Sequence, residues 1–328
     1  MRRGKKIYVY ALCDVYYDSF YLYGIQKLFS SYKFNINKFP KFRQGTFAVL
    51  IQDGDSAIKL IIDSRDTNEY DEEGLNWCDV YGKVNYNIKN IPKKHKEKIK
   101  PIGPSFGIKI WNFPITIFKA INNYLKFRRS ITNRREFLAN YWRQYKRLPL
   151  ESYQYAPSLN DYVFFTGSIW KKESLTNNAR AAFIKACKAN NKIVFEGGFA
   201  PRKDGDNLGF EDLVVTQRYD LQEYLNKIIL SSIAFNTPAV LSCHGWKLGE
   251  FLALGKAIIT THHYNTLPAE LKDNFHALNI DSNEDVASKI NLVLSDENFK
   301  TKLEKNSKQY FDEYLSPKIV IQRLLFKN

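Results

Sequence analysis

The sequence predicts an α/β protein with two Rossmann-like domains, at about 1–150 and 155–315. Three observations carry this prediction. The chain has 328 residues, 44% of them hydrophobic, which is enough for two domains that each bury a core. A polar segment with two prolines, 148–160, separates the halves. In the second half, short apolar runs alternate with segments of helical periodicity, as in a parallel, doubly wound sheet.

The first half predicts strands and helices around a long connection. These are a strand at 7–12, a helix at 16–30, strands at 47–51 and 58–62, a Lys- and Pro-rich connection at 89–112, and basic helices near 114–129 and 133–146. Between the second and third of these strands stands Asp53-Gly54-Asp55. It resembles a metal-binding DxD motif, but its place between two strands favours a hairpin turn.

In the second half, predicted strands and helices alternate more regularly than in the first. Strands are expected at 162–165, 192–195, 233–235, 257–260 and 277–280, and helices at 176–189, from Asp220, at 246–255, 283–295, 298–313 and 317–326. The helix from Asp220 opens with capping-box spacing, because Glu223 follows three residues later.

Other features bear on the compartment. No run of 18 apolar residues predicts a spanning helix, and the apolar run that ends before Asp14 is too short for a signal peptide. Four cysteines show no CxxC spacing, which is typical of free thiols in a reducing cytoplasm. We therefore expect a soluble, cytoplasmic protein.

The net charge of +15 is unevenly spread. Residues 83–147 hold 17 Lys and Arg against two acidic residues, so this basic block carries the whole excess. Such a block indicates an anionic partner or a solvated face. One interpretation is an interfacial helix on anionic lipid, with Phe118, Tyr124 and Phe127 in the headgroup layer. The others are an ordinary amphipathic helix and nucleic-acid binding, for which no reader module is present.

The stretch 236–260 reads as a strand, a loop, a helix and a strand. A loop at the carboxyl end of a parallel strand is where open α/β sheets bind ligands. Gly245 lets a ligand approach the backbone, the helix amides suit a phosphate, and Lys247 adds a positive charge. Glu250 lies among apolar residues and needs a partner, such as the vicinal hydroxyls of a ribose.

The run from Gly245 to Ile259 resembles the donor-site helix of GT-B glycosyltransferases of the bacterial surface-polysaccharide type, in the glycosyltransferase family 1/4 group. Glu250 and Gly255 match the second half of the Glu-seven residues-Glu motif of retaining members, whereas the first Glu would fall on Ser242. The stereochemical outcome therefore stays open. The resemblance covers about 160–315. It implies two domains facing across a cleft, with 316–328 crossing back to the first.

Small residues and a cation that follow the first strand of this half would suit a diphosphate; they are Thr166, Gly167, Ser168 and Lys171. Together with Gly245, Trp246, Lys247, Leu248 and Glu250, they form the expected set of donor-binding residues. A polar surface turn is the alternative for 166–168, and Arg180 is expected on a solvated face. Glu196-Gly197-Gly198 is interpreted as a tight turn. His262 and His263 are adjacent in the chain and point opposite ways in a strand, so no metal site is expected.

Two residues are candidates for catalysis. Asp14 ends the first strand and could act as general base, or cap a helix; His244 adjoins the donor glycine. The expected function is transfer of a sugar from a nucleoside diphosphate sugar, with no cofactor, to a saccharide or lipid-linked saccharide in cell-surface polysaccharide synthesis, at the inner membrane face. The alternative is a non-enzymatic protein that binds nucleic acid or another polyanion. A Rossmann oxidoreductase is disfavoured, because no GxGxxG follows a predicted strand.

Overall fold

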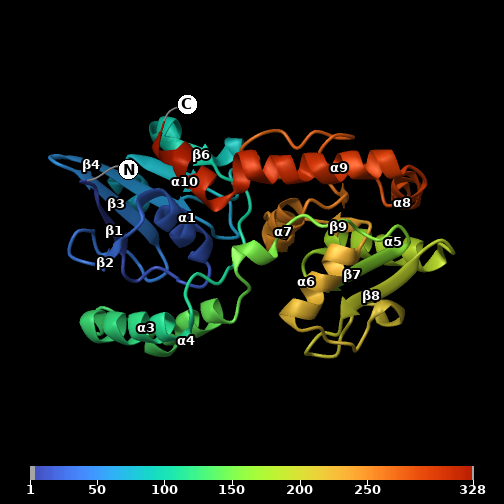
Figure 1. Ribbon diagram of the computed structural model, residues 1–328, viewed down its shortest axis with the longest axis horizontal. Helices are drawn as coiled ribbons and strands as arrows, with labels where there is room; N and C mark the ends of the chain where they lie inside the picture. The colour runs from blue at the N-terminus through green and yellow to red at the C-terminus, as the bar shows by residue number, and fades with distance from the viewer. Residues whose placement is uncertain (1–3, 327–328) are drawn as a thin grey trace. The chain divides into compact units, whose positions relative to one another are not determined.

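The computed structural model describes residues 4–326 and divides into two compact units (Figure 1). The N-terminal unit comprises Met1–Ser152, Thr266–Pro268 and Glu313–Asn328, and the C-terminal unit comprises Tyr153–Asn265 and Ala269–Asp312. The first passage between the units falls within the polar segment 148–160. The last helix, α10 (Pro317–Leu325), belongs to the N-terminal unit.

The N-terminal unit contains a six-stranded sheet in the order β2-β1-β3-β4-β5-β6. The strands are β1 (Lys6–Tyr10), β2 (Lys33–Asn35), β3 (Phe47–Asp53), β4 (Ser56–Asp63), β5 (Val80–Lys83) and β6 (Ile99–Pro101). Strand β3 runs antiparallel to β1 and β4, and the other pairs are parallel. This sheet is therefore mixed, unlike the wholly parallel sheet of a Rossmann domain.

The antiparallel pair follows from a local signal. Asp53 pairs with Ser56 across a two-residue turn in which Gly54 has φ +61°, a conformation that suits glycine. The hairpin prediction for 53–55 is confirmed. Strand β6 lies within 89–112, where only a connection was expected, because three residues give no measurable periodicity.

Four further helices complete this unit. They are α1 (Ser19–Phe29), α2 (Glu72–Trp77), α3 (Phe113–Phe127) and α4 (Arg134–Tyr145). Asn112 and Asn133 cap α3 and α4 by accepting from the amides of Ile115 and Glu136. Helix α1 packs on α10 so closely that a Cβ at Gly24 would lie 2.2 Å from a backbone oxygen of Pro317.

In the C-terminal unit every strand pair is parallel. Strand β7 (Tyr162–Ser168) pairs with β8 (Val194–Ala200), and β10 (Ile258–Thr260) lies between β9 (Ala234–Asn236) and β11 (Leu278–Asn279). The Ser232 amide donates to the carbonyl of Tyr162 at 2.8 Å, which ties the entry of β9 to β7. The carboxyl ends of these strands therefore meet at one edge, as predicted.

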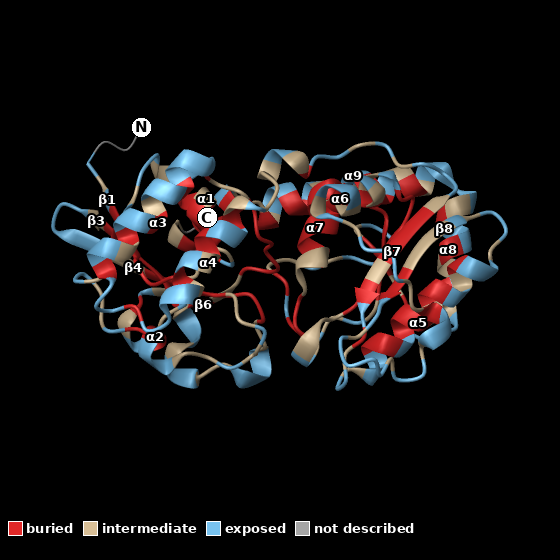
Figure 2. Cartoon of the chain, turned by 90° about the horizontal axis from the view of Figure 1, so that it is seen from below, coloured by how far each residue is buried: buried red, intermediate tan, exposed pale blue. Residues whose placement is uncertain are grey.

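The helices of this unit are α5 (Ser174–Ala189), α6 (Leu221–Leu230), α7 (Trp246–Leu254), α8 (Asp285–Ser295) and α9 (Glu297–Tyr310). The capping box of α6 forms as predicted, with Asp220 and Glu223 bonding each other's backbone amides. The rings of Phe183 and Phe235 stack at 4.4 Å in the core. Figure 2 shows buried residues along β7 and on one side of α5, which is the pattern of a sheet covered by helices.

Candidate functional site

A pocket of about 330 Å³ opens at the carboxyl ends of β7, β8 and β9, against the first turn of α7. It brings together two segments that are about 80 residues apart in the sequence. Six predicted donor-binding residues line it, namely Thr166, Gly167, Ser168, Gly245, Trp246 and Lys247. The lining also includes Arg180, Asn236 and Thr237, none of which was among the predicted donor-binding residues.

Lys247 places a partly buried ammonium group at this pocket. Its Nζ donates to the backbone carbonyl of Thr166 and lies 5.2 Å from the ring centre of Phe165. Burial, and then the charge of Arg180, lower the pKa of Lys247 to about 7, although the charge of Glu250 opposes this shift. The free site therefore holds a lysine that gains or loses its proton near neutral pH.

Arg180 is the second cation, and its expected place on a solvated face is wrong. The side chain is 8% exposed. Its Nε donates to Thr237 Oγ1 at 2.9 Å and its Nη1 donates to the carbonyl of Ser168 at 2.8 Å. Burial lowers its pKa to about 10. The sequence held a signal for this burial, because Phe183, Ile184 and Cys187 follow Arg180 at three, four and seven residues and so lie on the same side of α5.

The first turn of α7 presents backbone rather than a side-chain cap. Gly245 is the N-cap residue, and no side chain caps the helix there. Its φ is −77°, and an added Cβ would meet only the Cβ of Ala239, at 3.4 Å. Neither the backbone conformation nor packing therefore requires glycine. The backbone at Gly245 is therefore open to close approach from the pocket side.

Three predicted donor residues lie away from this pocket. Leu248 and Glu250 are buried on α7, and the carboxylate of Glu250 accepts from the Tyr224 hydroxyl at 3.4 Å. Lys171 is exposed and pairs with Asp204 at 2.9 Å. The sequence identified the helix that carries Leu248 and Glu250, but which of its sides faces the pocket depends on packing.

His244 is buried beside His263, with ring centres 5.5 Å apart. Burial, and then the neighbouring His263, lower the pKa of His244 to about 3. This direction favours the neutral imidazole near neutral pH. Its nearest space is a narrow gap shared with Gly245 and Leu248, not the 330 Å³ pocket.

Asp14 belongs to the N-terminal unit and follows β1. Its Oδ1 accepts from the amides of Tyr16 and Tyr17, at 3.1 and 3.3 Å, so it stabilises the turn before α1. Burial raises the pKa of Asp14, although those amides oppose the shift. A raised pKa suits a general base. The capping alternative is wrong, because Asp18 is the N-cap residue of α1 and Asp14 bonds only amides of the turn before it.

The prediction of a tight turn at Glu196-Gly197-Gly198 is wrong, because these residues lie inside β8. Gly197 has φ +108°, and an added Cβ would meet the carbonyl oxygen of Phe165 at 1.9 Å. Glu196 accepts from the Tyr162 hydroxyl at 2.6 Å and pairs with Lys227. These residues therefore serve the contact between β7 and β8.

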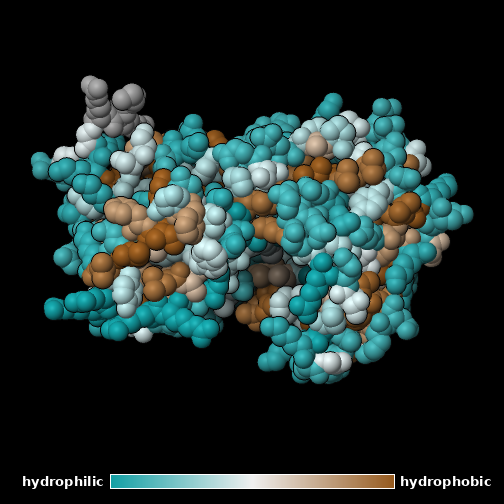
Figure 3. All heavy atoms as spheres, turned by 60° about the horizontal axis from the view of Figure 1, so that its bottom comes forward, coloured by the Kyte–Doolittle hydropathy of each residue, from teal (hydrophilic) through white to brown (hydrophobic). Residues whose placement is uncertain are grey.

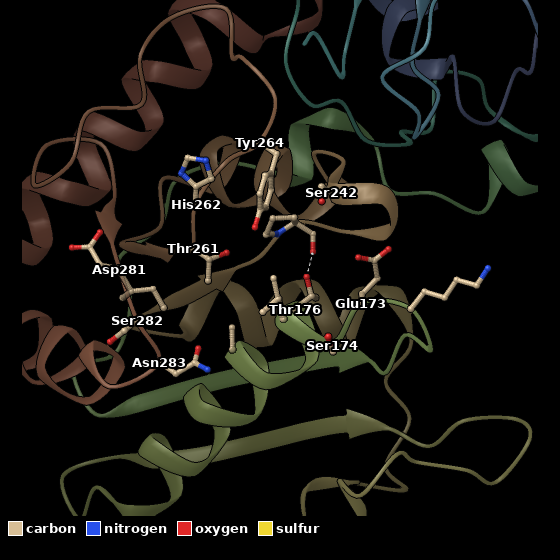
Figure 4. Close-up of a pocket in the computed structure, with 15 residues that line it drawn as sticks. Glu173, Ser174, Thr176, Ser242, Thr261, His262, Tyr264, Asp281, Ser282 and Asn283 are labelled. Atoms are coloured by element: carbon tan, nitrogen blue, oxygen red, sulfur yellow. Dashed lines mark hydrogen bonds between the residues drawn. The ribbon is translucent and has the colours of Figure 1, made fainter. Parts of the chain in front are cut away.

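A second pocket, of about 400 Å³, lies at the carboxyl ends of β9, β10 and β11. Figure 4 shows Glu173, Thr176, Ser242 and His262 around it. The loop that borders it is strained, since Leu241 and Ser242 both have φ +57°. Glu173 holds this loop by accepting from the Leu241 amide at 2.8 Å. Ser242, where the resemblance would place the first Glu, thus lines the second pocket.

Residues 4–326 contain no cluster of side chains that could bind a metal ion. No three His, Cys, Asp or Glu side chains of that range group closely enough to hold an ion. His263 bonds Thr260 Oγ1 at 3.1 Å, and His262 stacks edge-on against Tyr264.

No protein-family model and no curated protein matches this sequence. Several solved structures are similar. One is the C-terminal domain of a glycosyl transferase group 1 family protein (LpcC) from Francisella tularensis, with 16% identity and a TM-score of 0.35 over 50% of this chain and 95% of that one. A glycosyltransferase from Rickettsia africae has 13% identity and a TM-score of 0.42, over 75% and 62% of the two chains.

WaaG, a glycosyltransferase involved in lipopolysaccharide biosynthesis, is also similar, with 13% identity and a TM-score of 0.36 over 76% of this chain and 78% of that one. All three are described as glycosyltransferases, the class that the α7 residues resemble. Because each TM-score is below 0.5, the proposal below rests on the site itself.

Proposed function

We propose that this protein transfers a sugar from a nucleoside diphosphate sugar to a hydroxyl group of a saccharide, free or lipid-linked. The observation that carries the proposal is the convergence on one pocket of two cations, one buried and one partly buried. Lys247 and Arg180 meet there with the uncapped first turn of α7 and the small residues 166–168. Two cations and a helix N-terminus match the charge of a diphosphate.

The same groups would assist the reaction. When the bond between the anomeric carbon and the diphosphate breaks, negative charge develops on the leaving oxygen. Lys247, Arg180 and the amides after Gly245 would stabilise that charge, because all three border the pocket. Their positive charges suffice for a diphosphate, so the proposal requires no metal ion.

We assign two further roles on chemical grounds. Glu250 keeps the ribose role that the resemblance implies; because it does not line the pocket, its side chain would have to leave Tyr224 and turn toward the ligand. Asp14 would take the proton from the acceptor hydroxyl, because its raised pKa makes it a stronger base than an ordinary aspartate. His244, neutral and buried, would only shape the loop before α7.

Calorimetry with UDP and GDP, with and without EDTA, tests the donor site. We expect one of the two nucleotides to bind with a 1:1 stoichiometry, and EDTA to leave the affinity within twofold. Failure of both nucleotides to bind would refute the proposal. Binding that disappears with EDTA would refute the metal-independent part alone.

A substitution at Asp14 tests the catalytic assignment separately. Asp14→Asn retains an oxygen that can accept from the amides of Tyr16 and Tyr17, so the turn should persist. We expect kcat for sugar transfer to fall about 100-fold or more, with the nucleotide Kd unchanged. An unchanged kcat would leave Asp14 a structural turn residue. Binding of duplex DNA in place of either nucleotide would favour the polyanion-binding alternative.

A further inference from the structure

Helix α3 is apolar on the side that faces solvent. The residues it buries against the unit are Thr116, Ala120, Asn123 and Phe127, which follow helical spacing. At about 100° per residue, the opposite side is centred near Ile121 and Leu125. These two side chains are 53% and 58% exposed, and Phe118 beside them is 70% exposed. An amphipathic helix that only packs on its own domain shows the reverse pattern.

Helix α4 extends this surface. Its Leu138 and Trp142 are exposed and stand four residues apart, on one side of the helix. The rings of Trp142 and Phe113, which opens α3, meet edge-on at 6.5 Å. We call the combined surface the α3–α4 face; its exposed apolar residues are Phe113, Ile117, Phe118, Ile121, Leu125, Leu138 and Trp142. Figure 3 shows a band of hydrophobic residues on the side of α3, bordered by hydrophilic ones.

The border of this face is positively charged. Lys126, Arg128, Arg129, Arg134 and Arg135 are all exposed around the turn between α3 and α4. Glu136 is the one acidic residue between Lys109 and Arg147, and it pairs with Arg143. The face therefore joins apolar side chains to cations with almost no opposing charge.

Other cations of the basic block are engaged inside the unit. Lys83 is fully buried and pairs with Asp63 at 3.0 Å. Lys98 donates to the carbonyls of Leu75 and Cys78, and Lys100 to those at the end of α10. The basic block therefore holds structural cations as well as exposed ones, and among the exposed ones Lys126, Arg128, Arg129, Arg134 and Arg135 border the α3–α4 face.

We propose that the α3–α4 face docks on a membrane surface rich in anionic lipid, with α3 lying along the surface. No helix within residues 4–326 has the length and apolar character to cross a bilayer. A helix of 15 residues is about 22 Å long. Lying flat, it would place Phe118, Ile121 and Leu125 below the headgroups and the arginines among the phosphates.

This assignment corrects the aromatic residues expected to enter the headgroup layer. Phe118 is available, whereas Phe127 is buried in the unit and Tyr124 is half-buried. The apolar face also distinguishes lipid from nucleic acid. Phosphates of a duplex would engage the arginines but offer nothing to exposed Phe, Ile and Leu side chains.

Co-sedimentation with vesicles tests the proposal. One set contains phosphatidylcholine alone and the other adds 30% phosphatidylglycerol, at about 50 mM salt. We expect the full chain to pellet only with the anionic vesicles. Arg128, Arg129, Arg134 and Arg135, all changed to Ser, should lower the partition coefficient by roughly fivefold for each arginine removed. The double change Phe118→Ser and Ile121→Ser should lower it at least tenfold.

Matched variants control for total charge and hydrophobicity. Lys89, Lys93, Lys94 and Lys96 are exposed in the same basic block, so changing these four to Ser removes equal charge elsewhere. Ile88→Ser with Leu292→Ser removes two exposed apolar side chains outside the face. Both controls should pellet like the native chain.

Three results would overturn the proposal. They are a native chain that stays in the supernatant, a lysine variant as impaired as the arginine variant, or vesicle binding that survives both changes to the face. Binding to duplex DNA that ignores Phe118→Ser and Ile121→Ser would assign the face to nucleic acid instead. UDP and GDP binding, measured on the same proteins, keeps this test separate from that of the donor site, because neither change touches the 330 Å³ pocket.

Discussion

The two regions that carry function in these proposals use positive charge in opposite ways. The pocket of the C-terminal unit has two cations, the buried Arg180 and the partly buried Lys247, and both are bonded to backbone or hydroxyl oxygens. The α3–α4 face has five exposed cations around an apolar surface. The first arrangement fixes the position of one small anion. The second attracts an extended anionic surface without fixing any single group.

The difference shows that a count of charges does not locate a binding site. The basic block carries the whole net charge of the sequence. Its Lys83, however, is as buried as any core residue and links β5 to β4 through its bond to Asp63. The C-terminal unit contributes little to the net charge, yet its two cations lie where a diphosphate would bind. Burial and bonding partners separate structural, binding and docking cations, and each class responds to a different perturbation.

The largest expected effect concerns the structural cation. Asp63 accepts from Lys83 Nζ at 3.0 Å, from the Tyr81 hydroxyl at 2.6 Å and from Arg65. Burial alone would raise the pKa of Asp63, but the Arg65 bonds and the charge of Lys83 lower it overall. Asp63→Asn should leave Lys83 buried without its counter-charge and reduce the free energy of unfolding by about 3 kcal/mol. Urea denaturation at pH 7 measures this.

Asp53→Asn is the control, since Asp53 pairs with Lys5 at the surface and is 54% exposed. It should change stability by less than about 0.5 kcal/mol. Because the pKa of Asp63 is lowered, its stabilisation is present at neutral pH and is lost as pH falls through the native pKa. The difference in the free energy of unfolding between Asp63→Asn and Asp53→Asn should therefore become smaller at acidic pH. Equal losses at pH 7 would show that Asp63 and Lys83 contribute no more than a surface pair.

The next effect separates the binding cations from exposed ones. Lys247→Met keeps the length of the side chain but removes its charge. We expect the nucleotide Kd to rise about 30-fold, equivalent to roughly 2 kcal/mol for a charge-assisted contact. Lys171→Met is the matched control, because Lys171 is exposed and pairs with Asp204 outside the pocket. Calorimetry of both variants measures this, and equal affinities would remove Lys247 from the donor site.

Salt sharpens the comparison between the pocket and the α3–α4 face. Exposed charges are screened over about 8 Å at physiological ionic strength, whereas buried ones are screened much less. Raising salt from about 50 to 300 mM should reduce vesicle binding at least tenfold, and nucleotide affinity less than threefold. Sedimentation and calorimetry on one preparation give both numbers. If nucleotide affinity falls with salt as steeply as vesicle binding does, the cations of the donor site are screened by salt like exposed ones.

The smallest expected effect is a pH dependence of nucleotide binding. The pKa of Lys247 is about 7 in the free protein because of burial, so above pH 7 the amine is mostly neutral. A bound diphosphate favours the charged form and raises this pKa, so binding takes up a proton. The Kd should therefore rise severalfold between pH 7.5 and 8.5. Lys247→Met should abolish this slope, and proton uptake follows from calorimetry in buffers of different ionisation enthalpy. A flat profile in the native chain would mean that Lys247 stays charged without ligand.

Much of the architecture was predictable because it depends on short-range patterns. The capping box at Asp220, the hairpin at Gly54 and the strand-loop-helix at 236–254 are each specified by residues within a few positions of one another. The short strands β2, β5 and β6 were not predicted. Their three or four residues form strands only because neighbouring strands complete their hydrogen bonds.

The sequence by itself determined that Gly245 and Lys247 open a helix beside a strand end, and that positive charge is concentrated in 83–147. Only the tertiary structure decided that Arg180 lies against Thr237 and Ser168, that Glu250 turns toward Tyr224, and that Phe127 is buried while Phe118 is exposed. The reason is physical. Helical periodicity places side chains on faces, but which face is buried depends on the element packed against it, and that element comes from a distant part of the chain.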